Sequence, residues 1–164
     1  MNYPKVLVGC PTSSFHSYCW EEYKTAVKSL SYKNYSIVVV DNSEDKNYYK
    51  NLEDKDIRVI KGEFTPNPIE RVVKSRNILR DVTLNEGHDY FLSLEQDVIP
   101  EKDALLRLVR RNKEIVSGVY FGRYVRNRQK KILPMLWVKT KDLKKNNEFV
   151  PVASKFINSN KLLK

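Results

Sequence analysis

The chain has 164 residues, a length that fits one domain with a real core and is too short for two comfortable ones. Hydrophobic residues make up 41% of the sequence and charged residues 30%, a globular balance, and no apolar run approaches the roughly 20 residues that a membrane-spanning helix needs. The formal net charge of +10 predicts attraction to polyanions such as nucleic acid, anionic lipid headgroups or nucleoside diphosphates.

Strand and helix patterns alternate along most of the sequence. Short apolar runs predict strands, and apolar stripes at helical spacing predict the helices between them. Ser17 is expected to cap the first helix, and Pro100 to lie in the first turn of the last. We expect strands at residues 5–9, 36–40, 57–60, 90–94 and 115–120. The first helix follows the first strand and buries the stripe Trp20, Tyr23, Val27 and Leu30. The second begins at Ile69 and carries Val72, Val73, Leu79 and Val82 inward, and the third follows residues 90–94 and buries Ala104, Leu105, Leu108 and Val109.

This order predicts an α/β fold, a three-layer sandwich with a Rossmann-like, mainly parallel sheet. Beyond Gly122 the sequence becomes basic and irregular, with short candidate strands at 136–138 and 149–152. We expect a single domain over residues 1–164.

Residues 90–100 combine an apolar run with two carboxylates. The run is typical of a buried parallel strand, and Glu95 and Asp97 follow it directly. Ligands of open α/β sheets bind outside the carboxyl ends of the strands. Residues two apart on an extended segment project to the same side, so both carboxylates could meet one Mg²⁺ or Mn²⁺ ion. The alternative is that they are ordinary loop acids, with Asp97 helping to cap the next helix.

A third acid, Asp41, ends the β-branched run at 36–40. An acid in this place suits hydrogen bonds from a ribose or base, although Asp, Asn and Ser are also common turn residues. No glycine-rich phosphate loop follows Gly9, so a phosphate group would need a metal or basic side chains. The strands at 5–9, 36–40 and 90–94 are expected to bring Pro11, Thr12, Asp41, Asn42 and residues 95–97 to one rim of the sheet.

Four segments together resemble glycosyltransferases of the GT-A fold, which use nucleotide sugars. Residues 6–12 are similar to the opening strand and Pro-Thr turn of that family, and residues 38–43 to its second strand, which ends in an acid. Residues 75–77, Ser-Arg-Asn, are similar to its Ala-Arg-Asn helix motif. Residues 92–97 occupy the place of its Asp-x-Asp motif, and Ile99-Pro100 follow. The resemblance covers about residues 4 to 122.

The resemblance implies a metal-dependent glycosyltransferase of the hexosyltransferase type, which moves a sugar from a nucleoside-diphosphate sugar to an unidentified acceptor. Asp97 would coordinate a divalent metal, Mn²⁺ or Mg²⁺, that bridges the diphosphate, and Glu95 would replace the usual first Asp. Residues 1–122 would form the donor-binding half, and residues 123–164 a short basic acceptor-side segment or tail. The residues implied to bind the nucleotide sugar are Pro11, Thr12, Asp41, Asn42, Arg76 and Gln96.

The sequence departs from the family at its carboxyl end, where an acceptor-binding segment is usual. Asp142 and Glu148 are the only acids there and neither lies in a recognisable motif, so we assign no catalytic base. The acceptor implied by the resemblance is unidentified and would be a glycan, a protein or a lipid. The late basic stretch would suit an anionic membrane surface. The amino terminus has no signal-peptide layout, so we expect a cytoplasmic protein, peripheral where it meets a membrane.

Two other functions fit parts of the sequence. A non-catalytic basic module that binds nucleotides or nucleic acid would use the late Lys/Arg face and its aromatics Tyr120, Phe121 and Tyr124. The sequence carries no recognised nucleic-acid motif, which disfavours nucleic acid as a partner. A nucleotidyltransferase of similar fold usually carries a glycine-rich, basic phosphate loop, which this sequence lacks.

Overall fold

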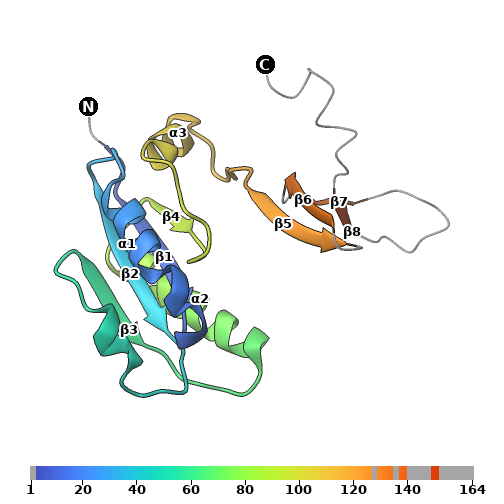
Figure 1. Cartoon of the computed structure of the whole chain (residues 1–164). Helices are drawn as coiled ribbons and strands as arrows, with labels where there is room; N and C mark the ends of the chain where they lie inside the picture. The colour runs from blue at the N-terminus through green and yellow to red at the C-terminus, as the bar shows by residue number, and fades with distance from the viewer. Residues whose placement is uncertain (1–2, 127–128, 135–136, 140–148, 152–164) are drawn as a thin grey trace, which may run out of the picture. The chain divides into compact units, whose positions relative to one another are not determined.

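A computed structural model describes residues 3–126, 129–134, 137–139 and 149–151. The chain divides into two compact units, Met1–Val116 and Ser117–Lys164 (Figure 1). The expected single domain, with its halves meeting at residue 122, stays a prediction. The first unit contains β1 (Val6–Thr12), the 3-10 helix η1 (Ser14–Cys19), α1 (Trp20–Lys28), β2 (Tyr35–Asp41), the 3-10 helix η2 (Tyr48–Leu52), β3 (Ile57–Lys61), α2 (Pro68–Asn85), β4 (Tyr90–Ser93) and α3 (Ala104–Arg110).

The first unit is built on a four-stranded, all-parallel sheet with strand order β3-β2-β1-β4, which confirms the predicted α/β fold and parallel sheet. In the ladder between β1 and β2, Val6 pairs with Tyr35 and Thr12 pairs with Asp41. On its other side β1 pairs with β4 only as far as Gly9 and Ser93. Because β4 ends earlier, the residues that follow it have room to turn across the carboxyl end of β1.

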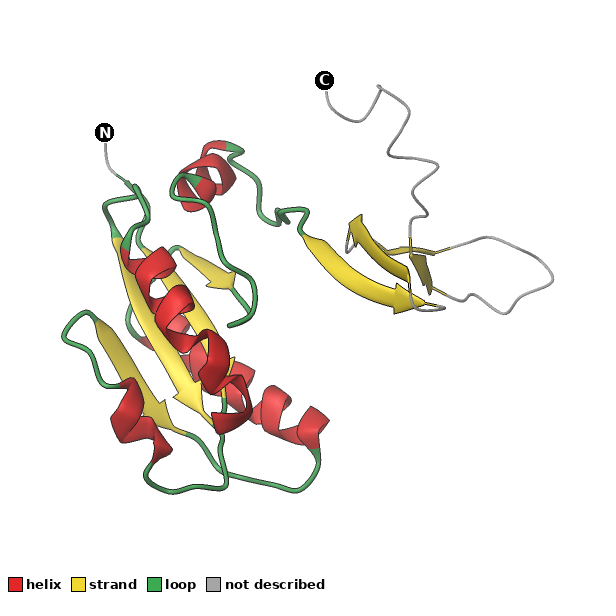
Figure 2. Cartoon of the chain, in the orientation of Figure 1, coloured by secondary structure: helices red, strands yellow, loops and turns green. Residues whose placement is uncertain are grey.

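Helices cover both faces of this sheet (Figure 2). Alternate residues of β1 point to opposite faces, as the two-residue period of a strand requires. One face packs on α1 and α3, and the other packs on α2. The first core includes Val6, Val8, Cys10, Trp20, Tyr23, Val27, Val39 and Leu105. The second core consists of Leu7, Val38, Val40, Leu79 and Val82.

Several helix boundaries differ from the predicted ones. Ser17 caps no helix, because it lies within η1 and α1 begins at Trp20. The α2 helix begins at Pro68, where the Asn67 side chain accepts hydrogen bonds from the Ile69 and Glu70 amides at 3.0 and 3.4 Å. Pro100 precedes α3 by several residues and is not in its first turn.

Burial also differs from the prediction at the ends of elements. Val72 and Val73 are 38% and 51% exposed, because the buried side chains of α2 start only at Ser75. Of the stripe expected in the last helix, only Leu105 is fully buried. The strand expected to be deeply buried, β4, is half-buried because it is the last strand of the described sheet.

The second unit contains two antiparallel pairs among its described residues. β5 (Phe121–Arg126) pairs with β6 (Gln129–Pro134), and β7 (Trp137–Lys139) pairs with β8 (Phe149–Pro151). β7 and β8 confirm the short candidate strands, apart from Leu136 and Val152, which lie outside the described residues. The strand expected at 115–120 is wrong, because these residues are exposed and form no ladder. Among the described residues no helix is long and apolar enough to cross a membrane.

Gly9 lets the Phe91 ring and the Leu79 side chain pack closely against β1. A Cβ at this position would lie 2.5 Å from the Phe91 ring and 3.0 Å from a Leu79 methyl group. The Gly9→Ala variant should therefore lower the free energy of unfolding by about 1–3 kcal/mol through overpacking. Urea denaturation followed by circular dichroism measures this loss. Gly118→Ala is the matched control, since no atom lies within 4 Å of a Cβ built there; equal stability of the two variants would contradict the close packing.

Candidate functional site

The polar side chains predicted at the carboxyl rim of the sheet do meet there. Thr12, at the end of β1, donates a hydrogen bond from Oγ1 to Oε1 of Gln96. The Gln96 amide Nε2 in turn donates to the carbonyl oxygen of His16 at 2.9 Å. Thr12 and Gln96 are each only 2% exposed. This buried chain of hydrogen bonds joins β1, η1 and the turn after β4, so Gln96 holds the rim together from inside.

Asp41 is fully buried and both of its carboxylate oxygens are engaged by the protein. Oδ1 accepts from the Ser43 amide at 2.9 Å and from the Ser43 hydroxyl. Oδ2 accepts from the Lys61 ammonium at 2.9 Å, and Lys61 also donates to the carbonyl oxygens of Ser43 and Asp45. Asp41 therefore stabilises a turn of the chain, as expected from the alternative interpretation that it is a turn residue. No oxygen of this carboxylate faces solvent.

Asn42 connects this turn to α2. Its side-chain Nδ2 donates to Ser75 Oγ at 3.1 Å, and Ser75 Oγ donates to the Arg71 carbonyl oxygen at 2.9 Å. Asn42 and Ser75 are both buried. The bond fixes α2 against the end of β2 and thereby positions the next residue of the helix, Arg76, at the rim.

Arg76 and Glu95 form an ion pair at the outer side of the rim. The Arg76 guanidinium donates from Nη1 to the Ser93 hydroxyl and from Nη2 to Glu95 Oε1. The two charged side chains are 37% and 46% exposed. A metal ion bound by Glu95 would have to compete with this guanidinium.

Glu95 and Asp97 do not lie on an extended segment, which corrects the geometry expected for a shared metal ion. β4 ends at Ser93, and the chain then turns so that the Val98 amide donates to the Glu95 carbonyl oxygen at 3.1 Å. Asp97 is exposed and no side-chain hydrogen bond or ion pair from the described residues engages it. The described residues contain no group of three or more His, Cys, Asp or Glu side chains placed to hold a metal. Asp97 is thus a rim carboxylate that no side chain of the described residues engages.

The electrostatic surroundings of Asp97 include η1. The pKa of Cys19 is raised by burial and further by the negative charge of Asp97. The pKa of the exposed Tyr18 phenol is raised by the neighbouring Cys19 and by the negative charge of Asp97. Burial also raises the pKa of Cys10, inside β1, to about 12, so this thiol stays neutral at physiological pH.

The structure adds to the rim three residues that the sequence analysis did not select: His16, Lys61 and Ser93. Lys61 follows directly after the predicted strand at 57–60, and parallel pairing sets it opposite Asp41. The pairing of residue 61 with residue 41 was therefore the feature that could have identified Lys61 as a rim residue. His16 contributes a backbone carbonyl, which residue type does not reveal. Pro11 lies buried within β1 and makes no side-chain polar contact.

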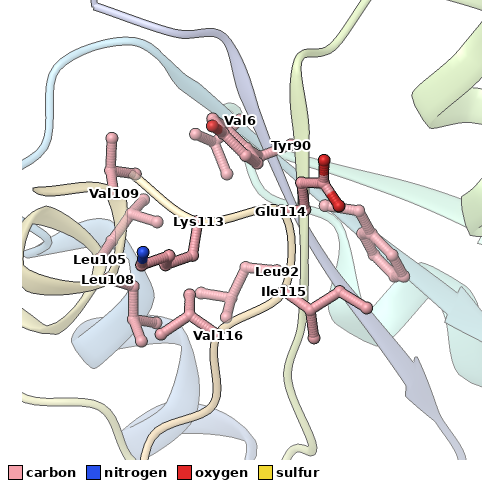
Figure 3. Close-up of a pocket in the computed structure, with 11 residues that line it drawn as sticks. Val6, Tyr90, Leu92, Leu105, Leu108, Val109, Lys113, Glu114, Ile115 and Val116 are labelled. Atoms are coloured by element: carbon pink, nitrogen blue, oxygen red, sulfur yellow. The ribbon is translucent and has the colours of Figure 1, made fainter. Parts of the chain in front are cut away.

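An apolar pocket of about 210 Å³ lies elsewhere in the first unit, between α3, β4 and the segment after α3 (Figure 3). Leu92, Leu105 and Val109 contribute to its wall, with Lys113 and Glu114 beside them. None of the polar rim residues lines it. The pocket therefore contributes no residue to the candidate site.

The fold and the rim define a class, an α/β protein with a Rossmann-like parallel sheet and a polar carboxyl edge. No protein-family model matches the sequence, and no curated protein matches it. A function must therefore be inferred from the rim itself.

The ion pair between Asp41 and Lys61 provides a test of the rim as a structural unit. Replacing Lys61 by Met leaves Asp41 as an uncompensated buried charge, and we expect the free energy of unfolding to fall by about 3–5 kcal/mol. Chemical denaturation measures the loss. The double variant Asp41→Asn/Lys61→Met should recover part of it, since the buried charge is then absent.

Lys74→Met is the control for this experiment. Lys74 pairs with Glu63 and Glu70, whose side chains are 70% and 47% exposed, so its loss should cost less than about 1 kcal/mol. A Lys61→Met variant as stable as Lys74→Met would show that Asp41 does not depend on its lysine.

Proposed function

We propose that this protein is a metal-dependent glycosyltransferase of the GT-A type, of the hexosyltransferase kind, which transfers a sugar from a nucleoside-diphosphate sugar. The observation that carries the proposal is the meeting of polar residues from four segments at one carboxyl rim, where α/β sheets bind ligands. Thr12, Asn42, Arg76 and Asp97 each come from a different segment of this rim. The four segments are the ones that carry the resemblance to that family.

The charges at the outer rim support a need for a metal. Arg76 and Glu95 neutralise each other, and Asp97 adds a negative charge. A diphosphate would be repelled by the resulting net negative charge unless a cation were bound with it. Mg²⁺ is commonly held by one or two carboxylates plus substrate phosphates, and the free carboxylate of Asp97 fits that pattern. When bound, Mn²⁺ or Mg²⁺ would stabilise negative charge on the diphosphate leaving group.

The side chains of the rim have distinct tasks in this proposal. Asp97 would hold the cation. Arg76 lies within reach of the same edge and can exchange Glu95 for a phosphate oxygen, which a guanidinium binds in a bidentate manner. Glu95 would be available to the cation only where its ion pair with Arg76 is open. Thr12, Asn42 and Gln96 hold the backbone around the nucleotide, since their own side chains are buried and hydrogen-bonded.

The partners follow from the same proposal. The donor is a nucleoside-diphosphate sugar, and the acceptor is a glycan, a protein or a lipid. The net charge of +10 favours an anionic membrane surface as a neighbour, which agrees with the expected cytoplasmic protein that is peripheral where it meets a membrane. The same charge favours the second candidate, a non-catalytic basic module for nucleotides or nucleic acid. Binding that weakens steeply with salt and ignores metal would identify that module.

Isothermal titration of the full chain with UDP and with GDP, each with and without Mn²⁺, tests the proposal. We expect one nucleotide to bind at least about tenfold more tightly with Mn²⁺, because the cation offsets the charge of Asp97 and the diphosphate. Asp97→Ala should remove this metal-dependent gain. Asp81→Ala, which removes an exposed acid of α2 paired with Arg80, is the matched control and should keep it.

Two results would count against this function. The first is an absence of binding for both nucleotides. The second is nucleotide binding that is indifferent both to Mn²⁺ and to the loss of Asp97. Arg76→Ala should weaken nucleotide binding in the presence of Mn²⁺ without changing the fold seen by circular dichroism, because Arg76 is partly exposed and its helix is fixed by Ser75.

A further inference from the structure

The positive charge of the chain is concentrated in its second unit. Residues 117–164 contain 12 Lys or Arg and only 2 Asp or Glu, whereas residues 1–116 contain 18 of each kind. Exposed charges reinforce one another only within about one Debye length, about 10 Å at roughly 0.1 M salt. A surplus that is confined to one short unit therefore attracts a polyanion far more strongly than the same surplus spread over the chain. A polyanionic partner would bind at the second unit.

The β5–β6 hairpin holds part of this charge in an unbroken series (Figure 1). Each of four successive residue pairs in its ladder contains one basic residue, and the strands contain no acid. These pairs are Arg123 with Ile132, Tyr124 with Lys131, Val125 with Lys130, and Arg126 with Gln129. Consecutive pairs in an antiparallel ladder are about 3.4 Å apart, so four cationic residues follow one another within roughly 10 Å of strand.

Exposed apolar side chains lead directly into this hairpin. Val119 is 59% exposed, Tyr120 is 43% exposed, and Phe121, the first residue of β5, is 61% exposed. Aromatic side chains favour the boundary between hydrocarbon and water, where tyrosine also keeps its hydroxyl group hydrated. Valine has neither a ring nor a polar group, so it gains free energy only where it leaves water for an apolar environment. The second unit thus combines a basic hairpin with an apolar approach to it.

This combination distinguishes between the two common kinds of polyanion. Nucleic acid and an anionic bilayer both attract cations, but only the bilayer offers hydrocarbon beneath its charged surface. Nucleic-acid sites read bases by hydrogen bonding or by ring stacking, and an exposed valine supports neither. We propose that residues 119–126 and 129–134 bind the surface of an anionic lipid bilayer. The basic hairpin would meet the headgroups, and the apolar residues 119–121 would enter the interface between headgroups and acyl chains.

The proposal assigns the membrane partner of the proposed function to a particular part of the chain. The role of that membrane in glycosyl transfer rests on the proposed function, while the binding does not. The first unit contains equal numbers of basic and acidic residues, so no net charge draws it to an anionic surface. Nucleotide binding at the rim and lipid binding at the hairpin can therefore be lost separately.

Co-sedimentation of the full chain with large unilamellar vesicles provides the test. One set of vesicles consists of phosphatidylcholine alone, and the other contains about 30% phosphatidylglycerol, each at roughly 0.1 M salt. We expect the chain to bind the anionic vesicles at least about tenfold more tightly, because every Lys or Arg near the surface adds to the attraction.

A pair of charge variants locates the contact. Lys130→Gln/Lys131→Gln should weaken binding to the anionic vesicles by about 25-fold, about fivefold for each cation removed from the surface. Lys46→Gln/Lys50→Gln removes the same charge from exposed positions of the first unit, and this matched control should change binding less than about twofold. Circular dichroism verifies that both variants are folded.

An apolar variant tests the choice of lipid over nucleic acid. Val119→Ser/Tyr120→Ser lies outside the β5–β6 ladder and should weaken vesicle binding by about tenfold, because the apolar contact with the interface is lost. The same proteins are titrated with a fluorescent single-stranded oligonucleotide and with a DNA duplex. Binding of either nucleic acid that is tighter than binding of the anionic vesicles would overturn the proposal and assign the hairpin to nucleic acid.

The remaining outcomes separate this proposal from the proposed function. The membrane contact is overturned if neutral and anionic vesicles bind equally, if neither binds, or if both lysine variants weaken binding to the same extent. Loss of vesicle binding in Lys130→Gln/Lys131→Gln with unchanged binding of UDP or GDP supports it. If neither nucleotide binds but the vesicle results hold, the membrane contact stands and the glycosyltransferase proposal fails.

Discussion

The parallel pairing of β1 with β2 and β4 is the constraint on which the rest of the structure depends. Because the strands run in one direction, the polar residues that follow them converge at one edge. Thr12 stands opposite Asp41 in the register of β1 and β2, and the turn after β4 reaches the same edge through Gln96. A slip of one residue in either ladder would turn these side chains to the opposite face and dismantle the rim.

Most polar side chains of the rim serve the fold. Asp41, Asn42 and Gln96 are all 6% exposed or less, and each is bonded within the protein. Buried polar groups destabilise a fold unless they are hydrogen-bonded, so these residues form a rigid inner ring. The outer ring differs, because Arg76 and Asp97 reach solvent there and are accessible to a ligand. This division into a buried inner ring and an exposed outer ring would keep a binding surface preorganised.

The net charge of the chain does not describe the charge of the rim. The chain carries +10, yet among the described residues the outer rim has the ion pair of Arg76 and Glu95 and the carboxylate of Asp97, which no described side chain engages. Residues 1–116 carry 18 Lys/Arg and 18 Asp/Glu, so the whole basic surplus lies in the second unit. Attraction of the whole chain to a polyanion and recognition at the rim are therefore separate physical problems. At the rim, a cation bound with a diphosphate would offset the repulsion between the diphosphate and Asp97, and an uncharged ligand would not be repelled.

The sequence by itself determined the alternation of strands and helices, the parallel sheet and the edge at which Thr12, Asp41 and Gln96 meet, because hydrophobic periodicity and parallel connection rules are local and general. It could not decide which of these side chains would face solvent. Asp41 is neutralised by Lys61 and Glu95 by Arg76, partners that are 20 and 19 residues away. The failed strand at 115–120 has the same cause, since a β-prone run becomes a strand only when another segment supplies its hydrogen bonds. Tertiary structure alone brings such partners together.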